Sequence, residues 1–404
     1  MATQSLRNLN LRGRRVFLRV DFNVPLKDGV IGDDTRITAS LPTLKFLLDA
    51  GASRVVVASH LGRPKGKPNK AMSLAPVAAR LSQLLGKPVS FAEDCIGPAA
   101  EDAVTQAPAG GVVLLENLRF HAGEEANDPA FAAALARLAD VYVNDAFGAA
   151  HRAHASVDAL VRLLPEAGTG LLMEAELRYL GHALEAPERP FVAILGGAKV
   201  SDKIEVIENL LPRVDRLIIG GAMAYTFVKA AGKPTGRSLV ENDKLDAARE
   251  IVATARTRGV QLLLPVDHVV AEKLEAGVPT ATLAIDDPAI GDRMGLDIGP
   301  VTVALYASAL ADAKTVVWNG PMGVFEIDAF AHGTMAVAQA VAAVAGTTIV
   351  GGGDSLAAVH KAKVTDRITH ISTGGGASLE FLGGRTLPGV AALPQARTSH
   401  RAAS

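Results

Sequence analysis

Short β-branched runs alternate with amphipathic stretches along the whole chain, and this alternation constrains the fold most. In the first half, four runs are typical of buried strands: Arg14–Val20, Ser53–Ser59, Gly110–Asn117 and Asp140–Asp145. Three stretches with apolar residues at helical spacing lie between or beside them: Thr43–Gly51, Leu74–Gly86 and Pro129–Asp140. Alternating strands and helices predict a parallel sheet that helices cover on both faces.

The same pattern begins again after residue 190. Its strand-like runs are Phe191–Gly196, Arg216–Gly221, Val260–Pro265, Lys314–Gly320 and Gly346–Gly353, and its helical stretches are Glu241–Gly259 and His332–Gly346. Two series in 404 residues, 49% of them hydrophobic, predict two α/β domains with a core each. The stretch 170–190 between them is charged and helix-forming, so it predicts a rigid connecting helix.

Charge and cysteine content argue against several classes of protein. The net charge is −1 with acids and bases interspersed, which argues against nucleic-acid or anionic-membrane binding. The N-terminus lacks the apolar segment of a signal peptide, and the apolar stretch 335–350 is too interrupted to span a bilayer. The single cysteine, Cys95, excludes an intrachain disulfide and fits a reducing cytoplasm. We expect Cys95 to be a partly buried, unreactive thiol with no base beside it.

Glycines cluster where strand-like runs of the second half end. The clusters are Gly196-Gly197, Gly220-Gly221, Gly351 to Gly353, and Gly374 to Gly376. In open parallel sheets, ligands bind at this carboxyl edge. Four such clusters predict a binding surface rather than four tight turns.

The glycine-rich stretch GGGDS opens a helix after a strand-like run. The N–H groups and dipole of a helix N-terminus attract anions, and glycines allow a phosphate to approach the backbone. Asp354 can hold Mg²⁺ against phosphates, or it can be an ordinary N-cap, and the sequence leaves both interpretations open.

A second phosphate signal is the stretch GGAKVSDK, although the chain has no P-loop motif. Lys199 and Lys203 stand four residues apart, so a helix would place them on one face. The alternative is a solvated lysine face. Two positive charges after a Gly-Gly strand end favour an anion site.

Polar and charged residues follow the strand-like runs of the first half. They are Asp21, Asn23, Arg36, His60, Arg63, Arg119, His151, Arg152 and His154. Arginine makes two parallel hydrogen bonds to phosphate or carboxylate, so their repetition predicts a small anionic ligand. The spacing of His151 and His154 does not predict a metal site. One half therefore suits a small anion and the other a polyphosphate, which indicates phosphoryl transfer.

Ten motifs stand in order over almost the whole chain and together resemble phosphoglycerate kinase. They are RVDFNVP, SHLGRPKGK, ENLRF, NDAFGAAHRAHAS, LGGAKVSDK, GGAMAYTF, MGLDIGP, WNGPMGVFE, GGGDS and STGGGASLEFL. The resemblance implies reversible phosphoryl transfer from 1,3-bisphosphoglycerate to ADP, giving 3-phosphoglycerate and ATP with Mg²⁺. It also implies two Rossmann-like lobes, each a parallel sheet flanked by helices, in a monomeric cytoplasmic enzyme that acts on small molecules.

The resemblance also assigns site residues. Those implied for phosphoglycerate are Asp21, Asn23, Arg36, His60, Leu61, Gly62, Arg63, Arg119 and Arg152. Those implied for the nucleotide are Lys203, Gly295, Glu326, Gly352, Gly353, Asp354 and Ser355, with Asp354 also on Mg²⁺. Arg36, Lys199, Gly375 and Gly376 would stabilise the phosphoryl group in transfer. Ser355 departs from the threonine that is frequent there but keeps the hydroxyl.

The resemblance implies the domain limits as well. They are a phosphoglycerate lobe over 1–170 to which 388–404 returns, a connecting helix over 171–188, a nucleotide lobe over 189–373 and a hinge over 374–387. Closure of the lobes would bring the substrates together and exclude water. The tail after Leu393 matches no motif, and we expect its end to be disordered.

Two other functional classes fit the sequence less well. A dinucleotide-dependent oxidoreductase is disfavoured because no GxGxxG follows the first strand. A nucleotide-binding protein without catalysis would not need Arg36, Lys199 and Asp354 together. No general base is conspicuous, and none is required, because the acceptor oxygens of this reaction are already deprotonated at neutral pH.

Overall fold

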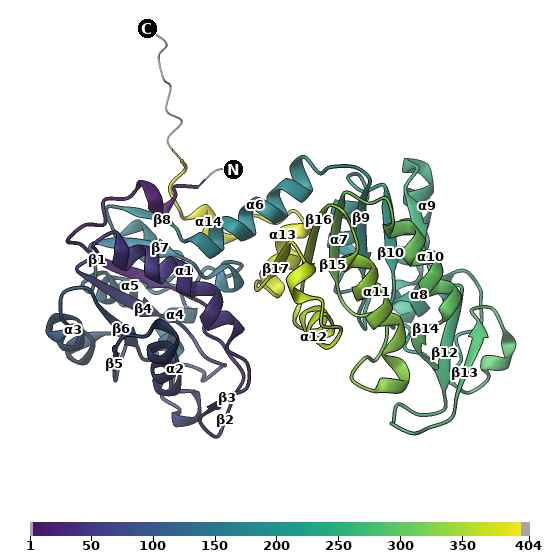
Figure 1. Cartoon of the computed structure of the whole chain (residues 1–404), viewed down its shortest axis with the longest axis horizontal. Helices are drawn as coiled ribbons and strands as arrows, with labels where there is room; N and C mark the ends of the chain where they lie inside the picture. The colour runs from purple at the N-terminus through teal and green to yellow at the C-terminus, as the bar shows by residue number, and fades with distance from the viewer. Residues whose placement is uncertain (1–2, 397–404) are drawn as a thin grey trace, which may run out of the picture. The chain divides into compact units, whose positions relative to one another are not determined.

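The computed structural model describes residues 3–396, and the chain divides into two compact units. The first unit comprises Met1–Leu177 and Thr386–Ser404, and the second comprises Arg178–Arg385. The division falls inside α6 (Leu171–Glu185), the helix that continues from one unit into the other (Figure 1). The last tail residues, from position 397 on, lie outside the described part, so the prediction for them stays open.

The first unit contains a six-stranded sheet in the order β5-β6-β4-β1-β7-β8, and every pairing in it is parallel. The strands are β1 (Arg15–Arg19), β4 (Arg54–Ala58), β5 (Val89–Ala92), β6 (Gly111–Leu115), β7 (Val141–Asn144) and β8 (Ala167–Thr169). A two-stranded antiparallel hairpin, β2 (Leu26–Lys27) with β3 (Val30–Ile31), follows β1. The sequence indicated four of the sheet strands and missed the short edge strands β5 and β8.

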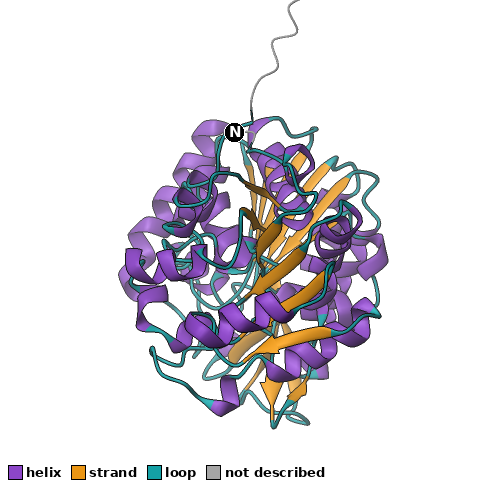
Figure 2. Ribbon diagram, turned by 90° about the vertical axis from the view of Figure 1, so that its left-hand side faces the viewer, coloured by secondary structure: helices purple, strands orange, loops and turns teal. Residues whose placement is uncertain are grey.

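Helices cover both faces of this sheet because its strands alternate two apolar sets. Val16 and Leu18 of β1 belong to a core cluster with α1 and α2, whereas Phe17 belongs to a second cluster with α3 and α5. The helices are α1 (Thr35–Asp49), α2 (Ala75–Leu85), α3 (Gly97–Gln106), α4 (Ala122–Glu125) and α5 (Pro129–Ala136). Figure 2 shows helices on both sides of the strands.

The end of the described chain packs against this first unit. Helix α14 (Pro388–Ala391) is fixed by a hydrogen bond from Gly389 N to Ala150 O, 2.8 Å long. Gln4 N donates to Pro394 O at 2.8 Å, and Leu393 is buried in the core cluster shared with α3 and α5. Both chain ends therefore contribute to the same unit.

The second unit repeats the parallel architecture with its strands in the order β11-β10-β9-β15-β16-β17. The strands are β9 (Phe191–Leu195), β10 (Arg216–Ile219), β11 (Gln261–Leu263), β15 (Thr315–Asn319), β16 (Thr347–Gly351) and β17 (His370–Ser372). Val192 and Ile194 pack with α10, α11 and α12, and Ala193 and Leu195 are buried on the opposite face. The predicted pair of helix-flanked parallel sheets is confirmed.

The helices of the second unit differ more from the sequence prediction than its strands do. They are α7 (Ile204–Leu210), α8 (Ala224–Ala230), α9 (Leu245–Arg258), α10 (Pro300–Leu310), α11 (His332–Ala342), α12 (Gly353–Lys361) and α13 (Gly376–Leu382). A small antiparallel sheet of β12 (Asp267–Ala271), β13 (Thr280–Ala284) and β14 (Met294–Ile298) was not predicted. No helix within residues 3–396 is long and apolar enough to cross a membrane.

Candidate active site

In the first unit, the predicted anion-binding residues follow adjacent strands. The central strands lie in the order β6-β4-β1-β7, and they are parallel, so their carboxyl ends meet at one edge. Asp21 and Asn23 follow β1, His60 to Arg63 follow β4, Arg119 follows β6 and Arg152 follows β7. The topology therefore gathers at one edge residues that are 131 positions apart along the chain, from Asp21 to Arg152.

A polar network joins three of these segments. Nη1 of Arg36, in the first turn of α1, lies 3.0 Å from Oδ1 of Asp21 and donates to the carbonyl of Asn23 at 3.3 Å. Oδ1 of Asn23 accepts a 2.9 Å hydrogen bond from Gly62 N. The guanidinium of Arg36 is thus held by neighbours, while about a third of its side chain stays exposed to a ligand.

Asn117 organises the next part of the edge, and the sequence analysis missed it. Its Oδ1 accepts from the N–H groups of Leu61 and Arg119, both at 3.1 Å, and its Nδ2 donates to Leu61 O at 2.7 Å. Arg119 donates from Nη1 to Gly62 O at 2.8 Å. The only sequence signal was an asparagine between a strand end and the predicted Arg119.

A fully buried ion pair lies beneath His60 and was also missed. Arg19, the last residue of β1, donates from Nε to Ser156 Oγ at 2.8 Å and lies 3.9 Å from Glu124. Its Nη2 is 3.2 Å from Nδ1 of His60. Glu124 in turn accepts from both N and Oγ of Ser156. A charged residue inside a buried strand was the available sequence signal.

The electrostatics of this edge favour anions. Burial, followed by the positive charges of Arg19, Arg119 and Arg36, lowers the pKa of His60 well below its usual value. Burial and nearby arginines also lower the pKa of His154 to about 4. Both histidines are therefore neutral at physiological pH and add no positive charge. The positive charge offered to a ligand comes from the arginines, of which Arg36 and Arg119 also face the carboxylates of Asp21 and Glu125.

Arg63 and Arg152 occupy the outer part of the set. Both are exposed, and Arg152 donates from Nε to Nε2 of His151 at 3.2 Å. Within the described residues, His151 and His154 belong to no cluster that could hold a metal ion.

In the second unit, the glycine clusters lie at one sheet edge, but the space around their glycines differs. A Cβ on Gly196 would lie 2.1 Å from Pro321 O, and one on Gly221 would lie 2.5 Å from Gly197 N. These glycines are required by close packing of loops. In contrast, no atom lies within 4 Å of a Cβ placed on Gly353 or Gly375. Gly197 and Gly221 of the first two clusters also line a cavity at this edge, so the predicted binding surface stays a prediction.

The two predicted lysines do not share a helix face. Helix α7 begins only at Ile204, Lys199 is exposed, and Lys203 is buried with Nζ donating to Oδ1 of Asn319. Burial lowers the pKa of Lys203 to about 8, against the opposing effect of Asp202 and Asp354. Asn319, which the sequence analysis missed, also donates to Gly351 O at 2.9 Å and thereby ties Lys203 to the end of β16.

The structure of the GGGDS turn decides whether Asp354 is an ordinary N-cap. The N-cap of α12 is Gly352 with a φ of 94°, a conformation that favours glycine, and Asp354 lies within the first turn. Asp354 is therefore not the helix N-cap, and its side chain is exposed. Ser355 is buried, and its Oγ accepts from Gly320 N at 2.6 Å, so this hydroxyl holds the neighbouring loop.

A cavity of about 450 Å³ lies beside this turn, and it brings three predicted residues together: Gly295, Glu326 and Asp354. Its apolar walls include Leu239, Pro265, Leu274, Leu296, Met322 and Val324. A Cβ on Gly295 would collide with Tyr225 Oη, so only glycine leaves this wall open. An apolar slot with a carboxylate at its rim suits a base and a ribose.

Gly375 and Gly376 stand at a second helix start. Gly375 is the N-cap of α13 with a φ of 53°, and Gly376 is the first helical residue. The turn before them is fixed by Ser372, whose Oγ accepts from Gly374 N at 3.2 Å and lies 2.6 Å from Ser378 Oγ. The first N–H groups of a helix have no acceptor within it, so they are available to an anion.

Comparison with known proteins gives one consistent result. The family model described as phosphoglycerate kinase matches residues 6–385. The phosphoglycerate kinase of Solibacter usitatus is 60% identical over 97% of this chain and 100% of that protein, and that of Moorella thermoacetica is 59% identical over 98% and 100%. A structure of phosphoglycerate kinase from Coxiella burnetii has a TM-score of 0.87 at 45% identity and covers 96% of this chain and 98% of its own. The chain therefore belongs to the phosphoglycerate kinase family and is a phosphotransferase.

Proposed function

We propose that this phosphotransferase moves a phosphoryl group reversibly from 1,3-bisphosphoglycerate to ADP, giving 3-phosphoglycerate and ATP. The observation that carries the proposal is the arginine-rich strand edge of the first unit, where His60 and His154 are held neutral by burial and positive charge. In this proposal the edge binds phosphoglycerate, and the cavity of the second unit binds the nucleotide.

The phosphoglycerate is held by the residues at the edge of the first unit. Arg36, Arg63, Arg119 and Arg152 supply positive charge, and Asn23, His60, Leu61 and Gly62 shape the edge. Asp21 orients Arg36 through their 3.0 Å ion pair. Paired arginine donors match the geometry of phosphate and carboxylate oxygens.

The nucleotide is held by the second unit. The base occupies the slot at Gly295, Glu326 accepts hydrogen bonds from the ribose, and the phosphates lie at the Gly352–Ser355 turn. Lys203 contacts the phosphates, because a buried ammonium with a pKa of about 8 gains stability from an anion.

Asp354 fits a role in binding Mg²⁺. Its carboxylate is exposed, lines the cavity and does not cap α12, and Mg²⁺ is commonly bound by one carboxylate together with substrate phosphates. When bound, the ion would neutralise phosphate charge.

Transfer itself rests on positioning and charge stabilisation. The attacking oxygen is already deprotonated at neutral pH, so no side chain has to remove a proton. Lys199, Arg36 and the N–H groups of Gly375 and Gly376 stabilise the equatorial oxygens of the phosphoryl group in transfer. The exposed position of Lys199 leaves its ammonium available for this role.

We further propose that the enzyme is a cytoplasmic monomer with small-molecule substrates. The lobe over 1–170 with 388–404, the nucleotide lobe over 189–373, the helix over 171–188 and the hinge over 374–387 remain our functional division of the chain.

A coupled assay of ATP-dependent phosphorylation of 3-phosphoglycerate tests the proposal. We expect turnover that requires both substrates and Mg²⁺. Nucleotide binding in a calorimeter without any turnover would instead indicate a binding protein of the same fold.

A further inference from the structure

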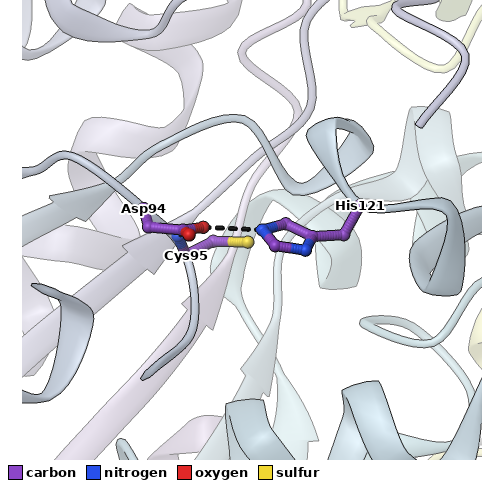
Figure 3. A group of neighbouring side chains, drawn as sticks. All are labelled: Asp94, Cys95 and His121. Carbon is purple, nitrogen blue, oxygen red and sulfur yellow. Dashed lines mark hydrogen bonds and ion pairs between the residues drawn. The ribbon is translucent and has the colours of Figure 1, made fainter. Parts of the chain in front are cut away.

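Three potential metal ligands, two partly exposed and one buried, converge in the first unit and are not among the residues assigned to substrates. They are Asp94, Cys95 and His121 (Figure 3). One ligand atom from each lies within 4.8 Å of both others. We propose that these side chains form a binding site for a borderline-soft divalent cation, with zinc as the best match.

The cluster joins two segments that are distant in sequence. Asp94 and Cys95 lie in the loop between β5 and α3, whereas His121 lies between the 3₁₀ turn Leu118–Phe120 and α4. Figure 3 shows the sulfur of Cys95 and a ring nitrogen of His121 facing the same point as the Asp94 carboxylate. The sequence analysis missed this arrangement because nothing in the neighbours of Cys95 indicates His121.

The local contacts hold the ligands in place. Nε2 of His121 is 2.7 Å from Oδ1 of Asp94, and the same oxygen accepts from Cys95 N at 2.6 Å. The His121 ring packs on Phe131, with 5.4 Å between the ring centres. A simple surface ion pair explains Asp94 and His121, and core packing explains the burial of Cys95. Neither reason requires the three ligand atoms to converge on one point.

The geometry requires only a small adjustment for zinc. Tetrahedral zinc with bonds of about 2.0–2.3 Å places its ligand atoms roughly 3.3–3.7 Å apart. The nitrogen and oxygen, 2.7 Å apart, would separate by about 0.6 Å, and the sulfur, at most 4.8 Å from either atom, would approach by about 1.5 Å at most. Three protein ligands leave a fourth position for water, and the side chains of Asp94 and His121, 43% and 32% exposed, provide access.

The ligand set selects the class of ion. Thiolate and imidazole ligands suit zinc, whereas Mg²⁺ prefers oxygen ligands, so this site would not compete for the Mg²⁺ at the nucleotide. Binding replaces the thiol proton by a zinc–sulfur bond and releases that proton to solvent. The fully buried Cys95, earlier expected to be only partly buried, is not an accessible nucleophile, which disfavours a role in surface thiol chemistry.

Metal titration of the full chain, freed of metal with a chelator and without nucleotide, tests the site. We expect one Zn²⁺ per chain in competition with a chromophoric chelator. Replacing His121 by Asn should weaken binding roughly tenfold or more, and so should Asp94→Asn. The matched control is His182→Asn, an exposed histidine on α6, which should leave the titration unchanged.

Cobalt gives a second readout that does not depend on enzyme activity. Because Cys95 is the only cysteine, a thiolate-to-Co²⁺ charge-transfer band can have only one source in this chain. We expect the band in the wild type and its loss in Cys95→Ser, with circular dichroism confirming the fold. The proposal is overturned if no ion binds stoichiometrically, if bound Co²⁺ shows no such band, or if His121→Asn binds Zn²⁺ as tightly as the wild type.

Discussion

The two units share an architecture, but their candidate sites are formed by different groups: mainly side chains in the first unit and mainly backbone in the second. The edge of the first unit is formed by side chains: Arg19, Arg36 and Arg119 are held by Glu124, Asp21 and Gly62, respectively. The edge of the second unit is made mainly of backbone, with helix starts at Gly352 and Gly375 and an apolar cavity.

The difference follows from what each edge is proposed to bind. A small, highly charged acid offers little apolar surface, so its binding has to come from charged donors in a fixed arrangement. A nucleotide offers a large apolar base and a chain of phosphates, which an apolar slot and helix N-termini can bind without many charges. The same parallel sheet therefore supports two kinds of recognition.

The largest effect should come from removing the buried charge of the first unit. Arg19→Met leaves the carboxylate of Glu124 buried without its ion-pair partner, so the free energy of unfolding should fall by about 3–5 kcal/mol. Chemical denaturation measures it. The double variant Arg19→Met/Glu124→Leu should recover most of the loss, and an equally unstable double variant would refute this account.

Next in size is the loss of the exposed cation of the second unit. Lys199→Ala should lower kcat roughly 100-fold or more, because a donor to the transferring group is lost, while nucleotide binding changes little. The matched control is Lys229→Ala, which removes an exposed lysine on α8 and should leave kcat unchanged. Near-normal kcat in the Lys199 variant would make this lysine an ordinary surface residue.

The histidines of the first unit make its stability sensitive to acid. The pKa of His154 is about 4 in the folded chain and ordinarily 6.5, so the unfolded chain binds its proton first as the pH falls. The wild type should therefore lose about 2 kcal/mol of stability from this residue between pH 7 and pH 5.

Unfolding of wild type and His154→Asn at both pH values isolates this contribution. Asp145 and Asp297, whose pKa values burial raises to about 7, act in the opposite direction and are common to both proteins. An unchanged pH dependence in the variant would show that His154 protonates freely in the folded protein.

Removing the charge of Asp354, the proposed Mg²⁺ ligand, should have a smaller effect, which appears only in the dependence of activity on Mg²⁺ concentration. Asp354→Asn keeps the size of the side chain but removes its charge, so half-maximal activity should require roughly tenfold more Mg²⁺. The fold should be intact because Asp354 is exposed and Gly352 is the N-cap. An unchanged Mg²⁺ titration would exclude Asp354 as a ligand.

The smallest effect is expected from Gly353→Ala, which tests whether this glycine is needed for binding the nucleotide. Gly353→Ala adds a methyl group into open space, so stability should hold, but a phosphate approaching that backbone would be displaced. We expect KM for the nucleotide to rise roughly fivefold, the loss of about one hydrogen bond, with KM for 3-phosphoglycerate unchanged. Gly181→Ala, equally open but on α6, should change neither constant.

The sequence by itself determined the architecture, the family and most of the proposed site residues. Strand and helix signals are local, and residues such as Asp21, Arg119 and Asp354 stand soon after the strands, so topology alone places them at a sheet edge. The edge strands β5, β8 and β17 escaped detection because none of them stands in a continuous run of β-branched and apolar residues.

Only the tertiary structure decided which residues support those positions. Asn117, Asn319 and Glu124 act through hydrogen bonds and ion pairs to segments far away in the chain, and such partners leave no local pattern. For the same reason the sequence could not show that Lys203 is buried while Lys199 is exposed, or that His121 meets Cys95. Local periodicity determines elements, whereas contacts across a sheet edge depend on how the elements pack.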